Sequence, residues 1–238
     1  MIAALGYLAA ALSIALTWPQ VWRSCRHGRT LGLSPTGSWL GVALNLCWLT
    51  FGVLTGDPAQ ILTNVVVGVG NTAILAALLV SQPRLRSREA LLRTATGAAG
   101  LAALAAGSVV AVVVVGADPA VVAAALGSVI SLVGAAAALP QPLSLLLNRS
   151  QDLSGLSPTR WHLGVGANAS WTGYGWLTSN PAVWLSAGVG LCGALVVCAI
   201  LRTVATGNRR SAVRPATGRP AEVRVLPSSA RGVLAAAA

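Results

Sequence analysis

Long apolar blocks, separated by short polar segments, run through about the first 200 residues of the chain. Each block has the roughly 20 residues that an α-helix needs to cross a hydrocarbon core of about 30 Å. The sequence therefore predicts an all-α membrane protein with seven transmembrane helices. They are expected at residues 2–22, 36–55, 58–81, 94–116, 119–146, 161–178 and 181–201.

The sixth block, 161–178, is the least hydrophobic of the seven. It contains His162, Asn168, Ser170 and four glycines. A helix of this composition is poorly suited to face lipid on all sides, so we expect it to be buried among its neighbours.

Composition and charge agree with a membrane protein and exclude two other classes. The chain is 55% hydrophobic and 9% charged, with a mean hydropathy of +0.74, which excludes an ordinary soluble domain. Its net charge of +11 results from sixteen arginines against five acidic residues, and the arginines lie outside the apolar blocks. Because these charges are sparse and not gathered on one exposed face, nucleic acid is not an expected partner.

The arginines also predict the orientation. They cluster at residues 23–29, 84–93, 149–160 and 202–231, and seven crossings place all four clusters on the same side of the membrane. By the positive-inside rule that side is the cytoplasm, with the N-terminus outside and the C-terminus inside. The bias toward Ala, Gly, Val and Arg without lysine indicates a GC-rich bacterial genome, so we expect a bacterial plasma membrane.

An internal repeat divides the chain further. Five features recur in order in residues 18–59 and 139–182: a Pro-Gln pair, Leu-Ser-Pro-Thr, Asn-x-x-Trp, a glycine, and Asp-Pro-Ala or Asn-Pro-Ala. We therefore predict a three-helix repeat at 1–81, a basic loop with a linker helix at 82–117, a second repeat at 118–202 and a disordered basic cytoplasmic tail at 203–238. The tail could contact anionic lipid, although setting the topology is the simpler role.

The duplicated Pro-Gln, Leu-Ser-Pro-Thr and Asn-x-x-Trp motifs resemble the PQ-loop superfamily. The seven-helix layout resembles the SWEET sugar transporters, and each half resembles the bacterial SemiSWEETs. The resemblance implies two parallel repeats joined by a linker helix, with a solute site between them near the midplane. It also implies that the two Pro-Gln pairs act as hinges; these are Pro19, Gln20, Pro140 and Gln141.

The first repeat supplies the main site candidates. Trp48 and Asn64 match the positions of the tryptophan and asparagine that line the sugar site of SemiSWEETs. Tryptophan faces cover the C–H surface of a sugar, and amides hydrogen-bond its hydroxyl groups. Packing between helices is the alternative role for this pair. Asn64 and Asn71 are seven residues apart and share one face of their helix.

The second repeat departs from the pattern, because Ala187 stands where a second site asparagine is expected. Asn168 or Tyr174 could substitute for it, and Trp171 repeats the position of Trp48. For Asn45 and Asn168, hydrogen bonding between helices is the favoured interpretation. The candidate substrate-binding residues are thus Trp48, Asn64, Asn168, Trp171 and Tyr174.

The predicted function is transport of a small neutral polar solute, most readily a sugar, by alternating-access facilitated diffusion. No aspartate or glutamate falls within a predicted helix, and proton-coupled carriers usually need an acid or histidine there. The alternatives are a PQ-loop amino-acid carrier, with or without proton coupling, and a membrane receptor or regulator that does not transport. Without a Cys-x-x-Cys spacing or a nucleophile–base pair, we expect no enzyme activity, metal or cofactor.

Overall fold

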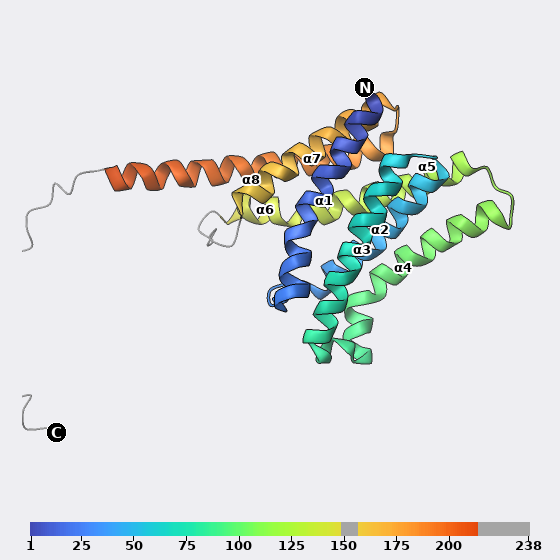
Figure 1. The fold of residues 1–238 in the computed structure, drawn as a ribbon, viewed down its shortest axis with the longest axis horizontal. Coiled ribbons are helices and arrows are strands. Elements are labelled where there is room, and N and C mark those ends of the chain that lie inside the picture. Colours follow the sequence, from blue (N-terminus) through green and yellow to red (C-terminus); the bar gives the residue numbers. More distant parts are fainter. Residues whose placement is uncertain (149–156, 214–238) are drawn as a thin grey trace, which may run out of the picture. The chain divides into compact units, whose positions relative to one another are not determined.

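The computed structural model describes residues 1–148 and 157–213, and everything said below concerns these residues (Figure 1). They form eight α-helices and one 3₁₀ helix. The helices are α1 (Ile2–His27), α2 (Pro35–Leu54), α3 (Pro58–Ser81), η1 (Pro83–Arg86), α4 (Arg88–Val113), α5 (Pro119–Ala138), α6 (Pro140–Leu147), α7 (Pro158–Leu177) and α8 (Pro181–Val213). Residues Met1–Leu201 form one compact unit, which holds both repeats, and Arg202–Ala238 form another.

A side-chain cap followed by proline starts four of the long helices. Asp57 accepts hydrogen bonds from the backbone N–H groups of Ala59 and Gln60, and Pro58 is the first residue of α3. The same combination starts α2, α5 and α7, where Ser34, Asp118 and Ser157 are the caps. Because proline lacks an N–H and has a helical φ, it suits the first helical position. These short motifs explain why the predicted and observed helix starts differ by at most three residues here.

The described part of the chain confirms the predicted all-helical class, since it contains no strand and one helical region for each predicted span. Six of these regions are long and apolar enough to cross a membrane. The remaining one is α7, the helix predicted to be least hydrophobic, which packs along α1 and buries Ala167, Ser170 and Tyr174. The orientation of the termini stays a prediction.

Four regions differ from their predicted bounds by five residues or more. The first helix ends at His27 instead of residue 22, and the fourth spans Arg88–Val113 instead of 94–116. The other two are the fifth helix and the last. The fifth predicted helix is interrupted at Leu139, between α5 and α6, because Pro140 and Pro142 both lack a backbone N–H. In contrast, α1 continues through Pro19. The last helix, α8, extends to Val213, so the first residues of the expected disordered tail are helical, and 214–238 lie outside the described residues.

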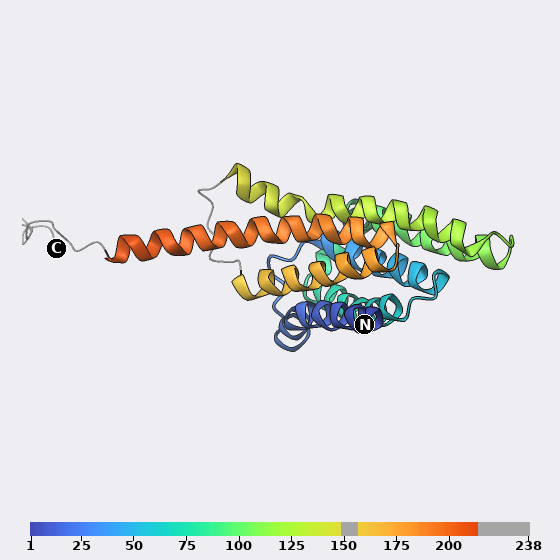
Figure 2. The same cartoon turned by 90° about the horizontal axis from the view of Figure 1, so that it is seen from above.

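The two repeats have the same helix order in space. In the first repeat, α3 packs against both α1 and α2. In the second, α8 lies against α5, where the Ser131 hydroxyl donates to the Ala182 carbonyl at 2.7 Å, and against α7, where Gly190 meets Asn168. The third helix of each repeat is thus its middle helix, and Figure 2 shows α8 running between α5 and α7.

The two repeats are joined because the first helix of each repeat packs against the second helix of the other. α1 packs against α7, and α5 packs against α2. Two glycines at matching positions permit these contacts. A Cβ on Gly6 would lie 2.7 Å from the Tyr174 ring, and one on Gly127 would lie 2.8 Å from the Phe51 ring. Because Phe51 and Tyr174 also match, the two interfaces are related by an approximate two-fold axis. The linker helix α4 breaks this symmetry by packing against α2 and α5.

Candidate functional site

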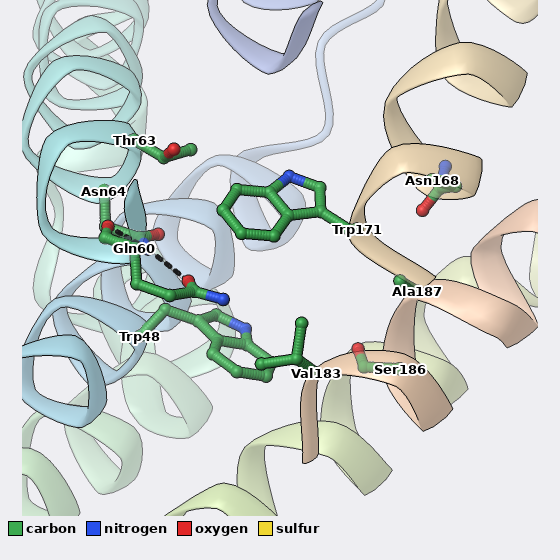
Figure 3. Close-up of a pocket in the computed structure, with 9 residues that line it drawn as sticks. All are labelled: Trp48, Gln60, Thr63, Asn64, Asn168, Trp171, Val183, Ser186 and Ala187. Atoms are coloured by element: carbon green, nitrogen blue, oxygen red, sulfur yellow. Dashed lines mark hydrogen bonds between the residues drawn. The ribbon is translucent and has the colours of Figure 1, made fainter. Parts of the chain in front are cut away.

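A cavity of about 180 Å³ lies between the second and third helices of the two repeats (Figure 3). We call it the central cavity. Nine described residues line it, contributed by α2, α3, α7 and α8: Trp48, Gln60, Thr63, Asn64, Asn168, Trp171, Val183, Ser186 and Ala187.

Eight of the nine lining residues form four pairs at matching repeat positions. The pairs are Trp48 with Trp171, Gln60 with Val183, Thr63 with Ser186, and Asn64 with Ala187. A cavity lined by equivalent residues of two repeats must lie on the axis that relates them. The central cavity therefore lies at the interface of the two repeats, around which they could rock against each other.

Both tryptophans of the cavity are held in the same way. Trp48 contacts Phe51 edge to face, with ring centroids 5.5 Å apart, and Trp171 contacts Tyr174 at 5.6 Å. The hydrogen bonding of their indole N–H groups differs. That of Trp171 donates to the Ser13 hydroxyl at 3.1 Å, whereas that of Trp48 has no hydrogen-bond partner among the described residues.

Several polar groups of the cavity are left available to a ligand. Among the described residues, no buried side-chain nitrogen or oxygen lacks a hydrogen-bond partner. The unpartnered indole N–H of Trp48, carboxamide nitrogen of Gln60 and hydroxyl of Ser186 must therefore reach open space. None of the nine lining residues is ionisable. The central cavity thus offers hydrogen bonds beside two aromatic faces and no formal charge, an arrangement suited to a neutral polar solute.

One end of the central cavity adjoins a wider space of about 580 Å³, which we call the PQ-end vestibule. The two share Asn168 and Ser186 as lining residues. Gln20, Arg23 and Arg160 also line the vestibule, so it opens at the end of the bundle that carries the Pro-Gln pairs and the first arginine cluster.

At the other end a separate hollow of about 670 Å³, the turn-end cavity, lies near the α2–α3 and α7–α8 turns. It shares no lining residue with the central cavity. The Tyr174 hydroxyl donates to Asp57 Oδ1 at 3.0 Å and so links the second repeat to the first at this end. In this conformation the central cavity shares lining residues with the space at the PQ end and none with the space at the turn end.

The structure brings together four of the five side chains predicted to bind substrate: Trp48, Asn64, Asn168 and Trp171 all line the central cavity. Tyr174 does not; it lines the turn-end cavity. Ala187, which matches Asn64 in the repeat, also lines the central cavity.

The two other predicted asparagines make different contacts. Asn45 bridges α2 and α3 as predicted, since its Nδ2 donates to Asn64 Oδ1 at 2.9 Å. The corresponding prediction for Asn168 is wrong, because its Nδ2 donates to the Gly164 carbonyl of its own helix at 2.8 Å.

Sequence reasoning missed Gln60, Thr63 and Ser186. The signal was present, because Gln60 and Thr63 lie four residues and one residue before Asn64, hence on or beside its helix face. Ser186 has the same relation to Ala187. Applying helical spacing to every polar residue of the third helices would have found all three.

The predicted hinge residues lie at the PQ end. Pro19 is inside α1, and Gln20 lines the vestibule while its Nε2 donates to the Ser24 hydroxyl at 2.9 Å. Pro140 begins α6 directly after the break in the fifth helix. Gln141 belongs to α6, and its side chain lies outside the described part of the structure.

A metal site has no support in the part of the chain that is described, where no three His, Cys, Asp or Glu side chains come together. Cys25, Cys47, Cys192 and Cys198 are free thiols. Cys47 is buried and its thiol donates to the Leu101 carbonyl at 3.2 Å, which is a packing role.

Comparison with known proteins supports the resemblance. Residues 1–61 match the family model described as the PQ loop repeat. The fold is similar to the solved structure of a eukaryotic SWEET transporter, with a TM-score of 0.66 and 17% sequence identity over 85% of this chain and 96% of that one. No curated protein sequence matches the chain. The family match thus covers the first part of the chain, and the structural match shows a SWEET-like fold.

Proposed function

We propose that this chain, which has a SWEET-like fold, is a PQ-loop membrane carrier that moves a small neutral polar solute, with a sugar as the preferred class, down its gradient. The observation that carries the proposal is the central cavity itself. It is lined by matching residues of two repeats, with two tryptophans and several unpartnered hydrogen-bonding groups. Polar groups inside a membrane are costly, so those that are retained usually serve a function, and here they converge on one small space.

The size of the cavity favours one small solute. At about 180 Å³ it is below the roughly 300–1,000 Å³ typical of sites for drug-sized ligands. We therefore expect a monosaccharide to be preferred over a disaccharide. The absence of ionisable groups among its lining residues argues against a zwitterionic amino acid, whose ammonium and carboxylate would lack counter-charges.

Alternating access would follow from rocking of the two repeats against each other around the cavity. In the described conformation the central cavity shares lining residues with the vestibule at the PQ end, and the contact of Tyr174 with Asp57 joins the repeats at the turn end. The opposite state would break that contact and narrow the vestibule. We assign the hinge role to Pro19, Gln20, Pro140 and Gln141, since Pro19 weakens α1 and Pro140 follows the break after α5.

The same proposal includes an orientation and a location. The apolar helices support an integral membrane protein. With the arginine-rich PQ end in the cytoplasm, the described conformation is open inward. We assign the chain to a bacterial plasma membrane, with anionic lipid as a contact of its basic C-terminal segment.

Uptake by the purified full chain in liposomes tests the carrier. Radiolabelled glucose, sucrose and alanine would be offered with and without a pH gradient, and protein-free liposomes and the Trp48→Ala/Asn64→Ala double variant would serve as controls. We expect saturable glucose uptake that needs no pH gradient and exceeds that of sucrose and alanine.

Each other outcome contradicts a defined part of the proposal. No uptake of any solute would remove the carrier and leave a receptor or regulator. Uptake that strictly requires the gradient would remove facilitated diffusion, and a preference for alanine would remove the sugar. A reporter active only in the cytoplasm, fused after Arg231, tests the orientation and should be active.

A further inference from the structure

Four carboxamides of the first repeat form a continuous hydrogen-bonded chain, which we call the amide chain. Asn71 Nδ2 donates to Asn45 Oδ1 at 2.7 Å, and Asn45 Nδ2 donates to Asn64 Oδ1 at 2.9 Å. Asn64 Nδ2 in turn donates to Gln60 Oε1 at 3.1 Å. The chain follows α3 over eleven residues, or about 16 Å of helix axis, with Asn45 contributed by α2.

The amide chain can run in one direction only. Asn64 Nδ2 also donates to the backbone carbonyl of Gln60 at 2.9 Å, and a backbone carbonyl can only accept. This bond determines which end of the Asn64 amide is the donor. Asn64 must then present its oxygen to Asn45 and its nitrogen to Gln60.

The direction determines which group of Gln60 faces the central cavity. Because Oε1 is turned to Asn64, the two N–H groups of Nε2 point away from it, and Figure 3 shows this nitrogen between the rings of Trp48 and Trp171. It has no hydrogen-bond partner among the described residues, although Gln60 as a whole is only 5% exposed. Rotating the amide by 180° would place two N–H groups against each other and lose the bond to Asn64. The cavity therefore receives a donor with a defined position.

The second repeat has no such chain. Val183, Ala187 and Ala194 occupy the positions of Gln60, Asn64 and Asn71, so only Asn168 remains of the four amides. Its Nδ2 is held by the Gly164 carbonyl, which leaves its Oδ1 as an acceptor. The central cavity thus has a donor wall in the first repeat and an accepting wall in the second.

We propose that Gln60 is the specificity-determining donor of the central cavity, and that Asn45 and Asn71 are positioning residues that hold its direction through Asn64. A solute then binds in one orientation, with a hydroxyl or carbonyl oxygen directed at Gln60 Nε2. This inference rests on the proposed transport function. It adds that the first repeat selects a solute by an oxygen atom that can accept a hydrogen bond from Gln60.

The Gln60→Met variant tests the donor cleanly. It keeps an unbranched side chain of similar length and leaves Asn64 its bond to the backbone carbonyl, so the fold should be retained. The probe is whichever radiolabelled monosaccharide the wild type takes up best, with its monodeoxy analogues as competitors. For the wild type, we expect one deoxy analogue to compete about tenfold more weakly than the parent sugar, the loss of one well-formed hydrogen bond.

In Gln60→Met, KM for the parent sugar should rise about tenfold with Vmax within twofold, and discrimination against that one analogue should disappear. Unchanged KM and unchanged discrimination in a variant that still transports would overturn the role of Gln60 while leaving the carrier intact. No uptake of any solute by the wild type would overturn both.

Asn71 provides the test of positioning, since it does not line the central cavity. Asn71→Leu should raise KM about threefold to fivefold and weaken the same discrimination, because Asn45 loses the donor that holds its amide. Asn71→Gln, which keeps an amide donor, should restore most of the affinity. The neighbouring Thr72→Ala is the matched control, as Thr72 is exposed and bonds only the Gly68 carbonyl of its own helix. If Asn71→Leu lowers only the yield of folded protein and not the selectivity, Asn71 has no positioning role.

Discussion

The two repeats face the central cavity with the same backbone arrangement and with different chemistry. Both place a tryptophan, a small hydroxyl residue and the start of their third helix around the cavity. The first adds Gln60 and Asn64, where the second has Val183 and Ala187. The comparison teaches that the repeats share the framework and the axis, whereas the amides of the third helices that line the cavity belong to one half alone.

The largest expected loss of uptake comes from replacing a cavity asparagine of the first repeat, and the same change in the second repeat provides the comparison. Asn64→Ala should lower the uptake rate at least about a hundredfold, because it removes a cavity amide and leaves Asn45 and Gln60 without their partner. Asn168→Ala should lower it less than about tenfold, since that amide bonds only its own helix. Initial uptake rates in liposomes, normalised to folded protein by size-exclusion chromatography, provide the measurement. Equal losses in the two variants would show that both halves recognise the solute equally.

The shared framework should respond symmetrically to overpacking. Gly6→Ala and Gly127→Ala each place a Cβ within 2.9 Å of two side chains, which costs about 1–3 kcal/mol. We expect the melting temperature of detergent-solubilised protein to fall by roughly 2–12 °C in both. Gly100→Ala in α4 is the control, as a Cβ there meets nothing within 4 Å. A fall in only one of the first two variants would indicate that the two interfaces are not equivalent.

The two repeats also differ at the turn end, in the residue that follows each cavity tryptophan by three positions. Tyr174 bonds Asp57 across the repeat interface, whereas its counterpart Phe51 has no hydroxyl group to bond Asn180. Tyr174→Phe should weaken closure at the turn end by about 1 kcal/mol, or roughly fivefold in the population that is open there. Tyr7→Phe, which alters an exposed tyrosine, should have no effect.

Spin labels at Thr55 and Thr178, both exposed near the turns, report this change in a background without the native cysteines. A distance distribution unchanged by Tyr174→Phe would mean that the contact between Tyr174 and Asp57 does not hold the turn end closed.

The smallest effect concerns the tryptophans. Ser13→Ala removes the acceptor of the Trp171 indole, which costs about 0.5–1.5 kcal/mol and makes this ring resemble Trp48, whose N–H is already free. We expect KM to change by no more than about threefold, as measured in the same uptake assay. A loss as large as that of Asn64→Ala would assign the second repeat a larger part in recognition.

Much of the fold could be predicted because its signals are local. Asp57 and Pro58 mark the start of α3, and the bounds predicted for that helix, 58–81, are those observed. The break in the fifth helix was missed because Pro142, a second proline in the first turn of α6, has no counterpart in α1, where Val21 stands.

The site was predictable in part for the same reason. Trp48 and Asn64 stand out as a repeated motif and a polar residue in an apolar helix, and both line the central cavity. The amide chain depends on how α2 and α3 are placed against each other, which brings Asn45 between Asn64 and Asn71. Tyr174 was misplaced for a similar reason, since its partner Asp57 lies in the other repeat.

Counterflow in liposomes tests the central claim most directly, that a solute bound between the two repeats is carried by alternating access. Liposomes that contain the wild type would be loaded with unlabelled monosaccharide and then diluted into a trace of the labelled sugar. A carrier should accumulate label transiently above its equilibrium level, and the Trp48→Ala/Asn64→Ala double variant should not. Label that only rises to equilibrium, or an overshoot that persists in the double variant, would contradict a solute site at the central cavity.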